Sequence, residues 1–124
     1  MASNTPFVPQ GNTISLTTSS TPSTSQSRQI TPANFGLGSA SIFPAQVRVV
    51  SRGTGDLWIN FTTATGTIVI PTPGTTTVGT PQLAIIIIPG AIEVFTLPTG
   101  SVLWVQDIST VASQTYHLLI GEGQ

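Results

Sequence analysis

The stretch Leu83-Ala-Ile-Ile-Ile-Ile-Pro-Gly-Ala-Ile-Glu-Val-Phe-Thr-Leu97 contains four consecutive isoleucines, which end at Pro89-Gly90 and are followed by an alternating segment. Isoleucine is β-branched and suits a pleated surface, and the apolar run is too short for a stable helix or a membrane span. We predict a strand buried on both faces. Such a strand needs cover from other parts of its own chain or from another protein chain. The simplest arrangement makes it a central strand of a sandwich, with Pro81 and Pro89 limiting pairing at its ends.

Short alternating segments lie on both sides of this strand. Residues 46–52 and 57–63 each place apolar side chains on one face, and Gly53-Thr-Gly-Asp56 between them predicts a β-hairpin. Similar segments occur at 67–71, 101–107 and 114–120. About seven to nine short strands separated by turn residues indicate an all-β, single-domain β-sandwich, which we expect to be jelly-roll-like. An immunoglobulin-like sandwich fits the same periodicity, although the cysteine pattern of that fold is missing.

The first 35 residues differ in composition from the rest of the chain. They are rich in Ser, Thr and Pro, with Phe7 and Val8 enclosed by prolines. We predict an extended N-terminal arm over residues 1–35, with one or two short strands, and a sandwich domain over residues 36–124. An arm of this composition is expected to become ordered on a partner or on a sister subunit.

Charge is scarce throughout the chain. Only 6% of the residues are charged, against ~25% in an ordinary soluble domain, lysine is absent and the net charge is −1. The chain therefore lacks the basic surface that nucleic acids and anionic membranes require. Ser and Thr make up 34 of the 124 residues. Such a surface gives weak repulsion between copies and suits an assembled protein, although a plain soluble β-domain has the same composition.

Residues capable of catalysis are few. His117 is the only histidine, and a Ser/His/Asp arrangement with Asp107 would need a nucleophile elbow that the sequence does not show. The four carboxylates are isolated from one another, and cysteine is absent. We therefore predict no enzymatic activity, no metal site and no cofactor.

Four further residues are candidates for binding. Trp58 and Trp104 each stand on the strand face opposite their apolar neighbours, where a tryptophan can pack in the core, anchor a protein interface or stack on a sugar. Arg48 and Arg52 share one strand face and can pair with acidic groups of this chain or of another subunit, or remain solvated.

Three segments resemble small virion proteins of tailed bacteriophages, of the capsid decoration or cement type. They are Val47-Arg-Val-Val-Ser-Arg-Gly-Thr-Gly-Asp-Leu-Trp-Ile-Asn-Phe61, Ile92-Glu-Val-Phe-Thr-Leu-Pro-Thr-Gly100 and Leu118-Leu-Ile-Gly-Glu-Gly123. The resemblance covers about residues 46 to 123. It implies a β-sandwich or jelly roll on the outside of a capsid, made in the host cytoplasm and bound across neighbouring major capsid subunits as a homo-oligomer, a dimer or trimer.

The sequence therefore leads us to expect a non-enzymatic virion protein that stabilises a phage head. A neck, tail or fibre-attachment component and a carbohydrate-binding module are the alternatives. We expect Phe7 and Val8 of the arm to form the main contact, with Trp58 and Trp104 next and the two arginines as further candidates.

Overall fold

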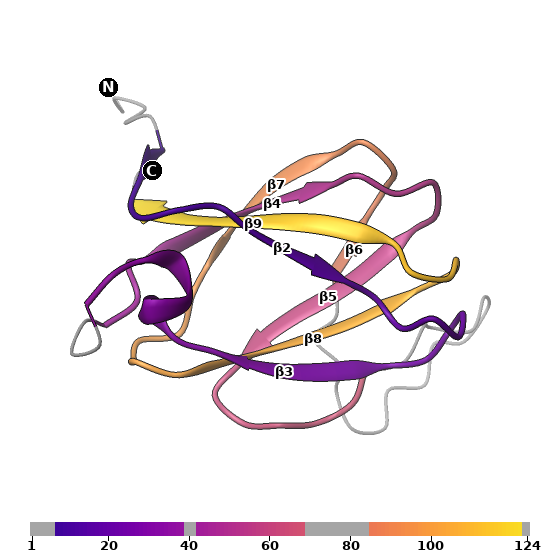
Figure 1. The fold of residues 1–124 in the computed structure, drawn as a ribbon, viewed down its shortest axis with the longest axis horizontal. Coiled ribbons are helices and arrows are strands. Elements are labelled where there is room, and N and C mark those ends of the chain that lie inside the picture. Colours follow the sequence, from indigo (N-terminus) through magenta and orange to yellow (C-terminus); the bar gives the residue numbers. More distant parts are fainter. Residues whose placement is uncertain (1–6, 39–41, 69–84, 123–124) are drawn as a thin grey trace.

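Two antiparallel sheets pack face to face in the computed structural model, which describes residues 7–38, 42–68 and 85–122 (Figure 1). The sheets contain nine strands: β1 (Val8–Pro9), β2 (Ile14–Thr17), β3 (Gln26–Ile30), β4 (Gln46–Ser51), β5 (Leu57–Thr62), β6 (Ile85–Ile87), β7 (Ile92–Thr96), β8 (Leu103–Ser109) and β9 (Thr115–Glu122). A single 3₁₀ turn, η1 (Pro32–Phe35), follows β3. No helix within the described residues is long and apolar enough to cross a membrane.

The strand order is that of a jelly roll. One sheet, called sheet A here, has the order β1-β9-β4-β7, and β2 pairs with β9 as well, next to β1 along the same edge. The other, sheet B, has the order β3-β8-β5-β6. The eight strands β2 to β9 thus form two four-stranded layers in which consecutive strands mostly alternate between the sheets. The predicted jelly-roll-like β-sandwich is confirmed.

The predicted hairpin between residues 46–52 and 57–63 is wrong. β4 pairs with β7 and β9 in sheet A, whereas β5 pairs with β6 and β8 in sheet B, so the turn at residues 53–56 carries the chain from one layer to the other. Each of the two strands has one apolar face. Placing the strands in opposite layers lets these two faces meet across the core.

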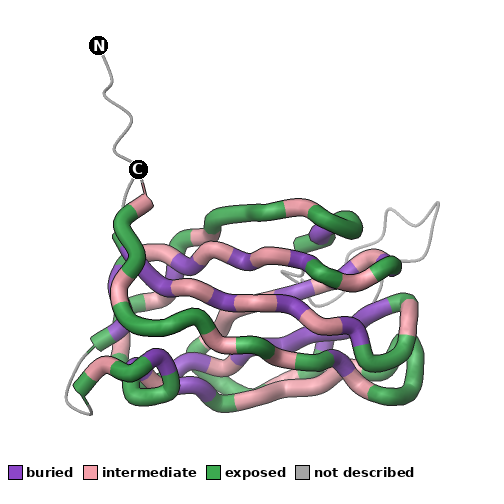
Figure 2. The backbone as a smooth tube through the Cα atoms, turned by 45° about the horizontal axis from the view of Figure 1, so that its top comes forward, coloured by how far each residue is buried: buried purple, intermediate pink, exposed green. Residues whose placement is uncertain are grey.

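The core lies between the two sheets. Residues alternate between buried and less buried along β4, along most of β9 and in the first part of β5, as strands that cover a core on one side should (Figure 2). Two of the fully buried side chains are aromatic: Phe35 of η1 and Tyr116 of β9. Burial of one large aliphatic side chain stabilises the fold by about 1.5–3 kcal/mol. The largest fully buried side chains come from both sheets, from η1 and from the segment after β5: Phe35, Val47, Val49, Leu57, Ile59, Ile68, Ile87, Leu103, Val105, Tyr116, Leu118 and Ile120.

The strands of the first 35 residues belong to the sandwich, which differs from the predicted division at residue 35. β2 pairs with β9 along four residues, and β3 pairs with β8 along five. The Ser-rich connection between these strands is bound to the β8–β9 loop, since Ser113 N–H donates to the carbonyl of Ser19 and Ser23 N–H donates to that of Ser109. Ile30 of β3 is buried in the core, and Ile14 and Leu16 of β2 pack against it.

The isoleucine run forms an edge strand, so the expectation of a strand buried on both faces is wrong. Among the described residues β6 has one neighbour, β5, and Ile87 is the one isoleucine of the run that is buried. Ile85, Ile86 and Ile88 are 47%, 40% and 59% exposed. Leu83 and Ala84, which precede the isoleucines, lie outside the described residues, as do residues 69–71 of the strand predicted at 67–71. Ile68 of that predicted strand is buried without forming a strand.

Candidate protein-binding surfaces

The outer face of sheet A combines apolar and cationic side chains. Arg48 and Val50 of β4 point away from the core, because they alternate with the buried Val47 and Val49. The neighbouring positions on β9 are His117, opposite Val50, and Leu119, opposite Arg48. We call the outward-facing residues of this surface the sheet A face: Phe7, Arg48, Val50, His117 and Leu119.

The residue before β1 is tied to this face by an aromatic contact. The guanidinium carbon of Arg48 lies 4.5 Å from the centroid of the Phe7 ring, a cation–π geometry. Gly121 makes the approach possible, since a Cβ there would lie 2.8 Å from the ring. The Nε of Arg48 is buried and has no hydrogen-bond partner. Phe7 and Arg48 therefore lie together, whereas Val8, the next residue, is exposed at the sheet edge opposite Glu122.

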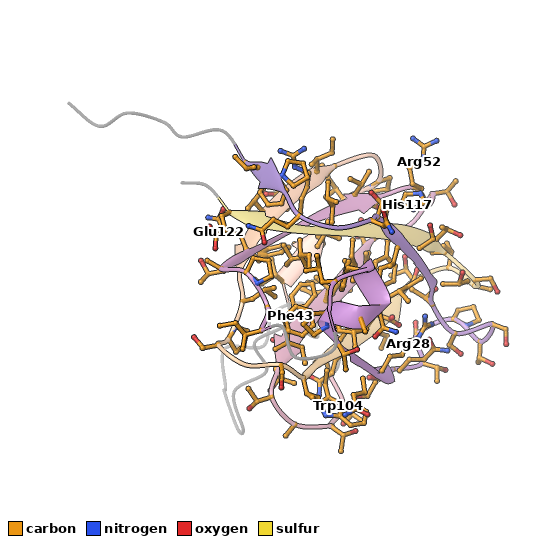
Figure 3. The ribbon with its side chains drawn as sticks, turned by 60° about the vertical axis from the view of Figure 1, so that its left-hand side comes forward. Arg28, Phe43, Arg52, Trp104, His117 and Glu122 are labelled. Carbon is orange, nitrogen blue, oxygen red and sulfur yellow. The ribbon has the colours of Figure 1, made fainter. Side chains whose placement is uncertain are left out.

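The charges around the sheet A face are mostly positive. Arg52 is exposed just beyond the end of β4, and it lies on the same side of the molecule as His117 (Figure 3). His117 Nδ1 lies 2.6 Å from Ser15 Oγ, which joins β9 to β2 on the outer surface. Glu122 is at the far end of β9, opposite Val8.

The two tryptophans lie on the opposite side of the sandwich. Trp58 and Trp104 are half-buried on the outer face of sheet B (Figure 3). This face is partly covered by the segment after β5, in which Thr65 donates a hydrogen bond to Ser27 Oγ and Ile68 is buried. The indole N–H of Trp58 is buried and has no hydrogen-bond partner among the described residues. The six predicted contact residues thus divide between two faces, and their binding role stays a prediction.

Sequence reasoning missed an apolar surface at the edge formed by β6 and β7. These strands end sheets B and A, respectively, and a short turn with Ala91 N–H donating to the Ile88 carbonyl joins them. The signal was present in the alternation of residues 91–97, but the isoleucine run was interpreted as core. We call the exposed aliphatic side chains on and beside these two strands the edge patch: Ile85, Ile86, Ile88, Ile92 and Val94. The patch is not one face, because Ile92 and Val94 lie on the outer face of sheet A beside Val50 and Arg48, whereas Ile86 lies on the outer face of sheet B beside Trp58.

A buried acid lies inside the sandwich. Asp107 accepts a hydrogen bond from the Tyr116 hydroxyl, and its Oδ1 has no partner. Burial raises the pKa of Asp107, although the Tyr116 hydrogen bond and the Arg28 charge act in the opposite direction. Burial also raises the pKa of Tyr116 well above its ordinary value, so this residue remains protonated. His117 lies on the outer surface, whereas Asp107 lies between the sheets, so the two do not form a Ser/His/Asp arrangement.

Gln114 connects three loops at one end of the sandwich. Its side-chain Oε1 accepts hydrogen bonds from the Gly55 N–H and the Ser109 hydroxyl, both at 3.1 Å. Its backbone N–H donates to Thr18 Oγ1 at 2.8 Å. The side chain is buried, and a Cβ on Gly53 would collide with it. This network explains why polar residues are buried here without loss of stability.

A cavity of about 270 Å³ opens beside β2, β3 and η1. Arg28 is the only charged side chain that lines it, and Arg28 also donates a hydrogen bond to Gln26. Within residues 7–38, 42–68 and 85–122, no group of three His, Cys, Asp or Glu side chains is placed to hold a metal ion. The cavity is lined by Ile14, Leu16, Arg28, Gln29, Ile30 and Asn34.

Comparison with known proteins adds one solved structure. No family model matches the chain, and no curated protein sequence matches it. Among solved structures, the coat protein of Tobacco streak virus is similar over 90% of this chain and 88% of that chain, with 10% identity and a TM-score of 0.33. The assignment of the fold rests on the strand order.

Proposed function

We propose that this chain is a non-enzymatic structural protein of a phage virion, which decorates the capsid and stabilises it by bridging major capsid subunits. The observation that carries the proposal is the sheet A face, where apolar side chains surround Arg48 in an uncovered layer of a jelly roll. The resemblance of residues 46–123 to decoration proteins supports it. Jelly rolls occur in viral capsid domains and in lectins, so the fold alone does not distinguish a capsid protein from a lectin.

Attachment through this face is non-covalent and requires no catalytic step. Val50 and Leu119 supply apolar area, and Arg48 supplies a guanidinium that is already held in place by Phe7. A side chain that is ordered before binding loses less entropy when it meets a carboxylate. Each contact between the chain and a capsid subunit can be weak. When many copies bind one capsid and each capsid subunit is held at several points, the attachment becomes effectively permanent.

The test uses capsids that lack this protein, to which the purified chain is added back. We expect the wild-type chain to cosediment with the capsids and to raise the temperature at which they open. Leu119→Glu places a carboxylate opposite Arg48 on the sheet A face and should abolish cosedimentation.

Gln29→Glu is the matched control, because it adds the same charge at an exposed position of sheet B. It should bind as the wild type does. Capsids that open at the same temperature with and without the chain would refute the stabilising role. If each virion contains only a few copies of the chain, its role is that of a neck, tail or fibre-attachment component and not of a decoration protein.

A further inference from the structure

The strand registers of sheet A place two exposed side chains of β7 on the same surface as the sheet A face. Val50 lies opposite Ile92, and Arg48 lies opposite Val94. Residues paired directly across neighbouring strands point to the same side of a sheet. Ile92 and Val94, which are 60% and 42% exposed, therefore extend this surface across the last strand of the sheet. On β4, β7 and β9 its outward side chains are Arg48, Val50, Ile92, Val94, His117 and Leu119.

Arg52 belongs to the same surface. Its N–H donates to the carbonyl of Thr115 at 3.1 Å, which continues the pairing of β4 with β9 one residue beyond β4. Arg52 therefore keeps the outward direction of Arg48 and Val50, and its exposed side chain points away from the ribbon (Figure 3). Four residues of a strand span about 13 Å. The two arginines thus stand about 13 Å apart along the outer surface, with Val50 between them.

Acidic residues are placed away from this surface, although the chain has four acids and three arginines. All of them lie within the described residues. Asp107 is buried between the sheets, and Asp56 is in the turn that leads to sheet B. Glu93 is opposite the buried Val49 and takes the inward register of β7, and Glu122 is the last residue of β9. The outer surface of sheet A therefore carries two cations in a chain whose net charge is −1.

We propose that the partner of this surface is an aliphatic and acidic surface of the capsid protein, with carboxylates about 13 Å apart that pair with Arg48 and Arg52. The inference rests on the proposed function and adds the chemistry by which the capsid is recognised. Aliphatic contact over Val50 and Ile92 removes water from the neighbouring arginines. A charge that loses water without gaining a partner opposes binding, so the partner has to supply carboxylates. The planar guanidinium group suits them, because it can bind a carboxylate through two hydrogen bonds.

Two variants with the same net charge test the arginine. Arg52→Gln and Gln29→Glu each lower the net charge by one, the first on the outer surface of sheet A and the second at an exposed position of sheet B. In cosedimentation with capsids, Arg52→Gln should bind about fivefold more weakly than the wild type and with a smaller dependence on salt concentration. Gln29→Glu should bind as the wild type does. Equal binding by the two variants overturns the role of the arginine.

The extension of the surface onto β7 is tested with two isoleucines. Ile92→Asn should weaken capsid binding by about fivefold, because it removes aliphatic area from the contact. Ile42→Asn is the matched control, since Ile42 is 63% exposed and lies outside the strands of sheet A. It should leave capsid binding unchanged. Equal effects of the two substitutions overturn the extension across β7.

Chemically modified capsids test the partner itself. Capsids whose surface carboxylates have been converted to neutral amides should bind the wild-type chain at least about tenfold more weakly than untreated capsids. Capsids whose lysines have been acetylated control for the treatment and should bind it at least as well as untreated ones. Unchanged binding to the amidated capsids, or an equal loss on both modified capsids, overturns this inference alone. A wild-type chain that does not cosediment with untreated capsids defeats the proposed function as well.

Discussion

β8 and β6 lie in the same sheet, yet polar residues are buried in β8 and apolar residues are exposed in and beside β6. In β8 the polar residues Gln106, Asp107 and Ser109 are at most 4% exposed. In and beside β6, three of the four isoleucines are at least 40% exposed. Burial in this protein is therefore decided by the place of a strand in the sheet more than by the hydropathy of its residues.

The difference follows from the neighbours of each strand. β8 lies between β3 and β5, with sheet A on one side and the segment after β5 on the other, so its polar groups must find partners inside. They do, since Asn60 donates to Gln106 at 3.0 Å and Tyr116 donates to Asp107. β6 pairs with β5 alone, and most of its isoleucines do not reach the core.

The strongest test of this comparison is within β6 itself. Ile87→Ala should lower the free energy of unfolding by about 3 kcal/mol, because a buried aliphatic side chain leaves a cavity. Ile86→Ala, one position away and half-exposed, should cost less than about 1 kcal/mol. Urea unfolding of the two variants measures both values, and equal losses would show that the strand is covered on both faces.

A second test concerns the buried polar network. Gln114→Leu keeps the volume but leaves the N–H of Gly55 and the hydroxyl of Ser109 without their acceptor, so we expect a loss of about 2 kcal/mol. Gln29→Leu is the control at an exposed position of sheet B and should change stability by less than about 0.5 kcal/mol. Thermal or urea unfolding gives both values. A Gln114 variant as stable as the control would mean that the network is dispensable.

The buried carboxyl predicts a pH dependence. Burial raises the pKa of Asp107, so the folded state holds this proton more tightly than the unfolded state. The stabilisation is fully present below the unfolded pKa, about 4, and is lost as the pH rises through the folded pKa. Relative to Asp107→Asn, the wild type should therefore lose free energy of unfolding as the pH rises from about 4 to neutrality. Parallel pH profiles of the two proteins would contradict the buried position.

The smallest effect on stability is expected at the exposed end of the isoleucine run. Ile88→Thr should change the free energy of unfolding by less than about 0.5 kcal/mol, because Ile88 is 59% exposed. Urea unfolding measures this change, and a large loss of stability would place Ile88 in the core and not at the exposed edge.

The alternation of apolar residues predicted several strands well. Residues 46–52, 57–63 and 114–120 correspond closely to β4, β5 and β9, and the buried faces of β4 and β5 are those that alternation predicts. Alternation reports which residues share a face, because side chains repeat every two residues in a strand. It does not report which strand lies beside which, so the predicted hairpin was wrong.

The sequence predicted the candidate binding surfaces less completely than the strands. Phe7 and Arg48 lie together, and Arg52 is exposed near the same sheet, but the tryptophans lie on the opposite face. The edge patch was missed because a run of isoleucines has the same composition in a central strand as in an edge strand. Only the pairing of β6 with β5 alone distinguishes the two cases.

The sequence by itself determined the all-β class, the short strands and the faces of β4 and β5, because these follow from local steric preference and a two-residue repeat. The tertiary structure decided the two layers, the burial of Asp107 and Gln114 and the exposure of the isoleucines. These depend on contacts between residues far apart in the chain, such as Thr18 with Gln114, which local patterns do not specify.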